Sequence, residues 1–177
     1  MAPDKTFSSR SSQLRQRAVD FTTAFVDITK GLGSPQDFLS SQFSSDPRIT
    51  EHGPAWAQSV VPIFDKTYRG HEDCTEYFEI LGGAFTCHFT DGSFPGPKEV
   101  VVDTESEGPD DEVGKARGVV WLSGHGSFTN NNNGKTFKET FAIRLSGFDE
   151  HAKIGHWEFW GDTLSAYAAV EGWSQLD

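Results

Sequence analysis

Hydrophobic residues recur at helical spacing in three segments of the first half of the chain. The first segment follows Ser12, a suitable N-cap, and ends at "KGLG". Its hydrophobic residues lie three or four positions apart and therefore share one helical face: Leu14, Ala18, Phe21, Phe25 and Ile28. A shorter helix is predicted in "SPQDFLSSQF", capped by Ser34. A third is predicted from about His71 to Gly82, where Gly82 and Gly83 should end it.

The later part of the chain changes to the two-residue period that is typical of β-strands. Five segments show this period: "AFTCHFTDGSF", "KEVVVDT", "KARGVVWLSGHGSFT", "KTFKETFAIRLSGF" and "KIGHWEFWGD". The Asn-Gly pair in "TNNNNGKT" tolerates positive φ and predicts an antiparallel hairpin between the two longest segments. The acidic stretch Asp103–Glu112 predicts a solvated hairpin tip. One earlier strand is expected in "DPRITEHGP", between Pro47 and Pro54.

The order of these elements predicts the fold class. Two helices, a strand and a third helix precede a meander of about five strands, which indicates an α+β domain. We expect about three N-terminal helices to cover one face of a curved antiparallel sheet. Residues 12–177 should form a single domain, and residues 1–11, which have little to bury, a flexible tail.

Composition narrows the possible partners and compartment. Aromatic residues make up 13% of the 177 residues, so rings should dominate the core, and a net charge of −11 argues against nucleic acid or an anionic membrane as a partner. No apolar run reaches the roughly 18 residues of a membrane helix. Cys74 and Cys87 have neither metal nor redox spacing, so free thiols and a cytoplasmic location are expected. The Ser-rich basic opening leaves a mitochondrial transit segment as the alternative.

Four segments carry a resemblance to a known family. They are the amphipathic first helix, the strand "ITEHGP", the segment "YRGHEDCTEYFEIL" and the closing "KIGHWEFWGDTLSAY". Together they resemble the nuclear transport factor 2-like superfamily over residues 12–170, specifically its SnoaL-like branch, and they are similar to SnoaL-like proteins of filamentous fungi. The resemblance implies a cone-shaped domain with a pocket, and a homodimer through the outer sheet face. It implies no single activity, because the superfamily includes isomerases, dehydratases, polyketide cyclases and proteins without catalysis.

Glu139 is an anomaly in the strand pattern. In "KTFKETFAIRL" it shares a face with Phe137, Phe141, Ile143 and Leu145, and this face must point toward the core. Desolvation among these side chains should raise the pKa of the carboxyl unless a partner compensates. Glu139 is therefore a candidate catalytic residue.

The last strand presents two faces that the pattern does not distinguish. His156 and Glu158 share one face, and Trp157 and Phe159 share the other. If His156 and Glu158 face the pocket, they join Glu139 as a catalytic group suited to proton transfer. If Trp157 and Phe159 face it, His156 and Glu158 lie on the outer face. Asp162 precedes a short helix and is expected to cap it.

Several other residues are candidates for substrate binding. They combine a ring with a place near the expected pocket: His52, Trp56, Tyr68, Tyr77, Trp121, His125 and Trp160. For the Trp and Tyr residues a plain core role is the alternative, and for His52 it is a hydrogen bond to a loop carbonyl. No histidine spacing fits a metal site, no serine lies in a nucleophile elbow, and no glycine pattern fits a phosphate, so no cofactor is expected.

Two functions remain open from the sequence. The first is a cofactor-free isomerase, cyclase or dehydratase that moves protons on a hydrophobic, oxygenated small molecule. The second is a non-catalytic protein that binds an apolar ligand or forms a dimeric interaction module. A cavity lined only by rings and aliphatic groups would favour the second function, and ionisable groups among the rings would favour the first.

Overall fold

The computed structural model describes residues 5–106 and 118–173 of the chain, with side chains from Arg10 onward. It contains helices α1 (Lys5–Thr29), α2 (Pro35–Gln42), α3 (Gly70–Ala84) and α4 (Thr163–Val170), and a short 3₁₀ turn η1 (Ala55–Ala57). The strands are β1 (Phe43–His52), β2 (Lys66–Arg69), β3 (Phe85–His88), β4 (Val101–Asp103), β5 (Val119–Asn130), β6 (Thr136–Ser146) and β7 (Ile154–Trp160). The α+β fold class predicted from the sequence is confirmed.

The seven strands form one sheet in the order β2-β1-β7-β6-β5-β3, with β4 paired to β5 as well. Every neighbouring pair is antiparallel except β1 and β7, which run parallel with Arg48 opposite His156 and Ile49 opposite Trp157. The expectation of a purely antiparallel sheet is corrected at this pair. The meander cannot provide a neighbour for both edges of β7, so β1 pairs with its free edge from the other end of the chain.

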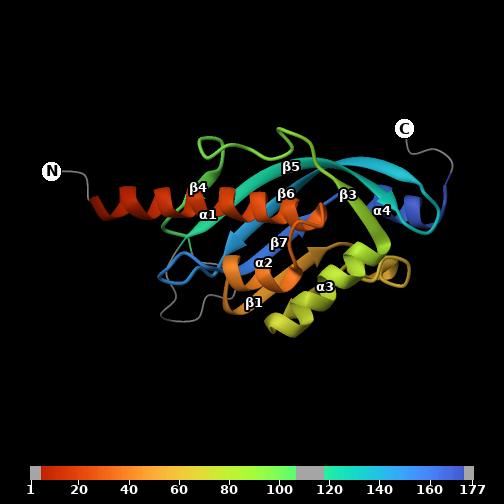
Figure 1. Ribbon diagram of the computed structural model, residues 1–177, viewed down its shortest axis with the longest axis horizontal. Coiled ribbons are helices and arrows are strands. Elements are labelled where there is room, and N and C mark those ends of the chain that lie inside the picture. The colour runs from red at the N-terminus through yellow and green to blue at the C-terminus, as the bar shows by residue number, and fades with distance from the viewer. Residues whose placement is uncertain (1–4, 107–117, 174–177) are drawn as a thin grey trace.

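Helices α1, α2 and α3 lie on one side of the sheet (Figure 1). Aromatic side chains fill the space between these layers, as the high Phe content predicts. Trp157 is 0% exposed at the centre of this core, where it meets Phe21, Phe25 and Tyr77 edge to face. Burying each of these rings contributes about 1.5–3 kcal/mol, so α1 and α3 are fixed on the sheet mainly by ring packing.

Helix boundaries differ from the expected ones at two places. Helix α1 begins at Lys5 rather than after Ser12, because a serine inside a helix costs little and strong helix formers follow it. Helix α3 continues through Gly82 and Gly83 to Ala84. Neither glycine has the positive φ that ends a helix, so both remain helical. The cap of α2 by Ser34 is confirmed, since its hydroxyl accepts a hydrogen bond from the Asp37 N–H.

Strand assignments agree for the long strands and differ for the short ones. The expected strand before Pro54 begins earlier, at Phe43, and β2 was not predicted, because its four residues follow a long loop. Only Val101–Asp103 of "KEVVVDT" form a strand. Residues 107–117 lie outside the described part, so the expected acidic hairpin tip is described only at its start.

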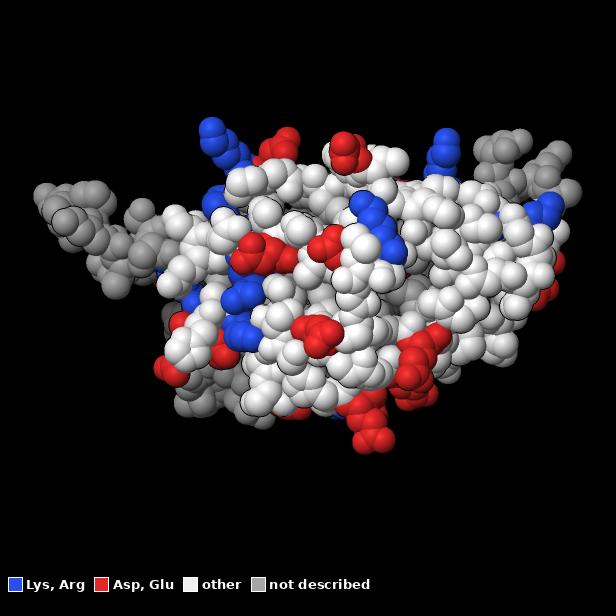
Figure 2. Space-filling view, in the orientation of Figure 1, with Lys and Arg blue, Asp and Glu red and all other residues white. Residues whose placement is uncertain are grey.

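Charged side chains do not form a single basic surface on the helical side. Figure 2 shows acidic and basic residues interspersed there among broad neutral areas. No described helix is long and apolar enough to span a bilayer.

Candidate active site

An aromatic cavity lies between the inner face of the sheet and the helices. Phe25 of α1 and Tyr77 of α3 contribute to its wall, Trp157 and Phe159 of β7 contribute from the sheet, and Ala166 of α4 lies at its end. Its empty volume is ≈ 520 Å³, including the part open to solvent. Aromatic side chains from several elements crowd its walls, so the cavity is narrow.

Glu51 brings a carboxyl group into this cavity from β1. Because side chains alternate along a strand, Glu51 shares the inner face with Ile49, while Thr50 and His52 point outward. Glu51 is buried, and the Tyr77 hydroxyl donates a hydrogen bond of 2.9 Å to its Oε2. Burial raises the pKa of Glu51 well above its usual value, and the nearby Glu139 raises it further, although the Tyr77 hydrogen bond acts in the opposite direction.

Glu139 brings a second carboxyl group from β6. Its Oε2 accepts a hydrogen bond of 2.9 Å from the backbone N–H of Asp162. Burial among the rings raises the pKa of Glu139 to about 7, opposed by the Asp162 N–H and reinforced by the Asp162 carboxylate. The sequence-based expectation that burial would raise this pKa agrees with its surroundings.

Burial therefore raises the pKa of both carboxyl groups in the cavity. Burial raises the pKa of Glu51 well above its usual value, and Glu139, with a pKa of about 7, is divided between acid and carboxylate near neutral pH. Carboxyl groups whose pKa values are raised by burial are the kind of group that general acid–base catalysis uses near neutral pH. Among the described lining residues there is no Lys, Arg or His to neutralise either group.

Cys87 also lines the cavity, but it is not arranged as a nucleophile. Burial, together with Glu139 and Glu51, raises the pKa of its thiol to about 12. The thiol is therefore protonated at neutral pH, and the thiolate is the reactive form.

His156 and Glu158 lie on the opposite face of the sheet from the cavity. The inner face of β7 is formed by Trp157 and Phe159, which contact α1, α3 and β6. This corrects the expectation that His156 and Glu158 share a pocket with Glu139. The large rings occupy the inner face because ring burial stabilises the core, whereas a histidine and a glutamate there would each need a polar partner.

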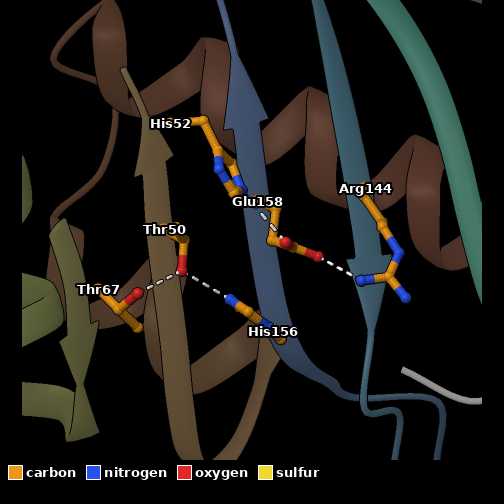
Figure 3. Close-up of polar contacts among 6 residues, drawn as sticks. All are labelled: Thr50, His52, Thr67, Arg144, His156 and Glu158. Carbon is orange, nitrogen blue, oxygen red and sulfur yellow. Dashed lines mark hydrogen bonds and ion pairs between the residues drawn. The ribbon is translucent and has the colours of Figure 1, made fainter. Parts of the chain in front are cut away.

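The outer face holds its own polar cluster (Figure 3). Glu158 Oε2 lies 2.5 Å from Arg144 Nη1 and its Oε1 lies 3.2 Å from His52 Nε2. His156 Nε2 lies 2.8 Å from the Thr50 hydroxyl, which also meets the Thr67 hydroxyl at 2.8 Å. Hydrogen bonds and ion pairs satisfy these side chains, so the cluster is suited to holding β1, β7 and β6 together.

The remaining candidates for substrate binding are dispersed over three places. Tyr77 lines the cavity, and Tyr68 is fully buried beside it without lining the cavity. On the outer face, Trp160 stacks between His52 and Trp121, at 4.0 and 5.3 Å between ring centroids. His125 lines a separate outer groove with His88 and Lys138.

Trp56 and Asp162 occupy the end of the cone near α4. Trp56 in η1 is 67% exposed and lies against Tyr167 of α4. Asp162 caps α4 as expected, because its Oδ1 accepts a hydrogen bond of 3.1 Å from the Ser165 N–H. The same Asp162 lines the cavity.

Glu51 is the site residue that the sequence interpretation missed. The signal was present in "RITEH", where Ile49 and Glu51 alternate with Arg48, Thr50 and His52. The sequence places the neighbouring His52 near the expected pocket, whereas its side chain lies beside Glu158 on the outer face. Which side of this short strand faces the core depends on its pairing with β7, and the local pattern does not specify it.

Among the residues that the structure describes, no group of three or more His, Cys, Asp or Glu side chains could hold a metal ion. The cavity chemistry that the described residues can perform themselves is proton transfer between the two carboxyl groups and a bound molecule.

Comparisons with known proteins identify the fold. No family model and no curated protein sequence matches the chain. Among solved structures, an NTF2-like protein from Burkholderia thailandensis has a TM-score of 0.55 at 20% identity, covering 88% of this chain and 95% of that one. A protein assigned as an isomerase from Bacillus subtilis has a TM-score of 0.59 at 10% identity, covering 92% and 97%.

A third similar structure is assigned as a SnoaL-like polyketide cyclase from Jannaschia sp. CCS1, with a TM-score of 0.54 at 12% identity, covering 89% of this chain and 93% of that one. At these identities the likeness concerns architecture. Four helices and a strongly curled mixed sheet, matched over nearly the whole length of each neighbour, show that the chain has the nuclear transport factor 2-like fold.

Proposed function

We propose that the protein is a cofactor-free acid–base enzyme, an isomerase, cyclase or dehydratase acting on a hydrophobic small molecule with a carbonyl oxygen. The observation that carries this proposal is the pair of buried carboxyl groups, Glu51 and Glu139, that line one aromatic cavity, each with a raised pKa. Glu139 is the general base and Glu51 the general acid.

The reaction begins with proton abstraction by Glu139. Its carboxylate takes a proton from the carbon beside the carbonyl, and the C–H electron pair becomes a new C=C bond while the carbonyl oxygen gains negative charge. Glu51, positioned by the Tyr77 hydroxyl on Oε2, donates its proton to that oxygen. Return of the first proton to a different carbon gives isomerisation. Its transfer to a departing hydroxyl gives dehydration. Attack of the enol carbon on a second carbonyl, whose oxygen takes the proton from Glu139, gives ring closure. In each case the enol O–H proton returns to Glu51 as the C=O bond reforms, so both carboxyl groups regain their starting states.

The electrostatics of the cavity indicate the charge of the substrate. Three acids, Glu51, Glu139 and Asp162, line it, and the described lining contains no basic side chain. An anionic group in this low-dielectric space would be repelled and would lack a counter-charge. The substrate is therefore uncharged where it occupies the cavity, with rings that pack on Phe25, Phe159 and their neighbours.

The assignments of two similar structures, an isomerase and a SnoaL-like polyketide cyclase, support this class of chemistry for a SnoaL-like protein. The free cysteines Cys74 and Cys87 support a reducing compartment, and we propose the cytoplasm.

A second candidate function is ligand binding without chemistry. The observation that favours it is the narrowness of the cavity, in which rings greatly outnumber polar groups. Binding and catalysis are distinguished by whether a bound carbonyl compound exchanges its α-protons.

The test uses hydrogen–deuterium exchange, which requires no knowledge of the natural substrate. The protein is incubated in D₂O with uncharged aromatic ketones, and loss of the α-proton signal is followed by NMR. We expect Glu139→Gln to slow protein-dependent exchange by about 10²–10⁴-fold, the range for general acid–base groups, and Glu51→Gln to slow it as well.

Glu76→Gln, on the exposed side of α3, is the matched control and should leave exchange unchanged. Affinity is measured in parallel for each variant by calorimetry. Exchange that is unaffected by Glu139→Gln would contradict the proposed base. Binding without any exchange in the unaltered protein would support the non-catalytic alternative.

A further inference from the structure

Exposed hydrophobic residues gather at the end of the molecule that holds α4. Trp56 is 67%, Leu164 61% and Trp173 52% exposed, although most other large hydrophobic side chains of the described residues are buried. Trp56 belongs to η1, Leu164 to α4, and Trp173 follows α4. Such a concentration is typical of a binding surface rather than of scattered surface residues.

These residues form one continuous surface around Tyr167. Trp56 meets Tyr167 edge to face at 5.1 Å between centroids, and Tyr167 meets Trp173 at 6.0 Å. Leu164 lies three residues before Tyr167 on the same helix, so the two are neighbours on its surface. We refer to Trp56, Leu164, Tyr167 and Trp173 as the aromatic rim.

The aromatic rim lies on the same two segments that line one end of the aromatic cavity. Thr163 and Ala166 of α4 line the cavity, and so do Ile63 and Phe64 of the segment that follows η1. The η1 segment and α4 thus both border the cavity, and the contact between Trp56 and Tyr167 connects them at the protein surface. Both segments lie at the same end of the molecule in Figure 1.

Backbone and side-chain hydrogen bonds hold the rim in place. Trp173 N–H donates to the Ala168 carbonyl at 3.0 Å, and the Asn133 amide donates to the Ala169 carbonyl at 2.9 Å. On the other side, the Gln58 amide donates to the Phe64 carbonyl at 3.0 Å. Fixed rings bind a ligand with less loss of conformational entropy than mobile ones, so this exposed surface is preorganised.

We propose that the aromatic rim is an outer subsite for the same ligand that enters the cavity. The inference rests on the proposed function. The cavity is narrow, so a ligand with more than one ring system extends through the end bordered by α4 and η1, and its outer ring stacks on Trp56 and Tyr167. The natural ligand is accordingly an elongated, uncharged molecule with at least two aromatic or planar ring systems, of which one carries the carbonyl group.

The test compares a short probe with a long one. Acetophenone has one ring, and 4-acetylbiphenyl adds a second ring in line with it. We expect the unaltered protein to bind 4-acetylbiphenyl more tightly, and Trp56→Ala to weaken that binding about tenfold while changing acetophenone affinity less than twofold. Trp56→Phe should restore part of the difference. Leu32→Ala is the control, since Leu32 is 73% exposed in the turn after α1.

Three results would overturn the outer subsite. They are absent or equal binding of the two probes, an equal loss of both in Trp56→Ala, and a change of sedimentation coefficient in Trp56→Ala without a change in probe affinity. The last result would make the rim an interface between protein copies. Deuterium exchange of the acetyl protons is measured on the same two probes, so an unaltered protein that shows the Trp56 effect on binding but exchanges no α-protons would reject the proposed chemistry and keep the subsite.

Discussion

Glu139 links the chemistry of the cavity to the pH dependence of stability. Its pKa is about 7 in the folded protein against 4.5 for the free side chain. Between these values the folded protein holds a proton that the unfolded chain has released. Stability contributed by the neutral acid is therefore lost as pH rises from about 4.5 through 7.

Replacing Glu139 with Gln should remove this part of the pH dependence. At low pH the two side chains are nearly isosteric and neutral, so the variants should be similarly stable. Above pH 7 the Gln variant should gain on the order of 2 kcal/mol relative to the unaltered protein, after allowance for partial solvent contact. Urea unfolding from pH 5.5 to 8.5 measures this difference. Parallel stability curves for the two proteins would contradict the shifted pKa.

Glu158 should matter for stability and not for turnover. Its side chain is 8% exposed beside Arg144, which is 13% exposed, so Glu158→Gln leaves a mostly buried guanidinium without its counter-charge. We expect a loss of about 2–4 kcal/mol in the free energy of unfolding, with deuterium exchange on bound ketones unchanged. Glu150→Gln, at the 84% exposed partner of His151, is the control and should cost little. If the folded Glu158→Gln protein lost deuterium exchange, the purely structural role of Glu158 would be wrong.

The sequence allowed one of the two acids of the proposed proton transfer to be predicted. Glu139 could be recognised because the long β6 strand places it among four hydrophobic residues of one face. Between Pro47 and Pro54, by contrast, Glu51 shares its face of the strand with a single hydrophobic residue, Ile49. The orientation of β7 could not be predicted, because Trp157 and Phe159 compete with His156 and Glu158 for the inner face, and tertiary packing decides the outcome.

At the scale of the elements, Gly155 in β7 fixes how closely the turn after β6 approaches the sheet. A Cβ atom at position 155 would overlap the backbone carbonyl oxygen of Gly147, and neither strand nor turn can yield without losing pairing. We expect Gly155→Ala to destabilise the protein by about 2–4 kcal/mol, the range of overpacked positions.

Gly83→Ala provides the matched control, because Gly83 lies in α3 with open space around it. Alanine favours a helix over glycine by about 1 kcal/mol, so this variant should be slightly more stable. Thermal unfolding of both variants measures the difference. Equal melting temperatures would show that the turn accommodates the extra methyl group.

Long elements with a clear period were predictable, whereas short ones were not. The two strands β5 and β6 and their Asn-Gly hairpin follow from alternation and turn chemistry alone. β2 has four residues, too few for a period, and is a strand because β1 offers it an antiparallel edge. Gly82 and Gly83 were misinterpreted as a stop because the composition of a helix end does not reveal its φ angles.

At the scale of the whole molecule, the order of helical and strand periods was enough to predict the fold class. It was not enough to predict which strand pairs with the free edge of β7. The parallel pairing of β1 with β7 joins segments far apart in the sequence, and no local pattern records it. A homodimer through the outer face stays a prediction. Val101 on β4 and Trp121 on β5 lie opposite each other and are both exposed. A second copy of the chain would cover these two hydrophobic side chains in such a dimer.

The pairing of β1 with β7 also determines how late in synthesis the sheet can be completed. Thr50 and His156 touch across 106 residues of chain, so β1 leaves the ribosome long before its partner exists. Until then one edge of β1 has unpaired backbone groups and its inner face lacks the cover of Trp157. A nascent chain paused before β7 therefore presents an open strand edge to chaperones and to other unfinished copies, and only the emergence of the last strand makes the fold self-sufficient.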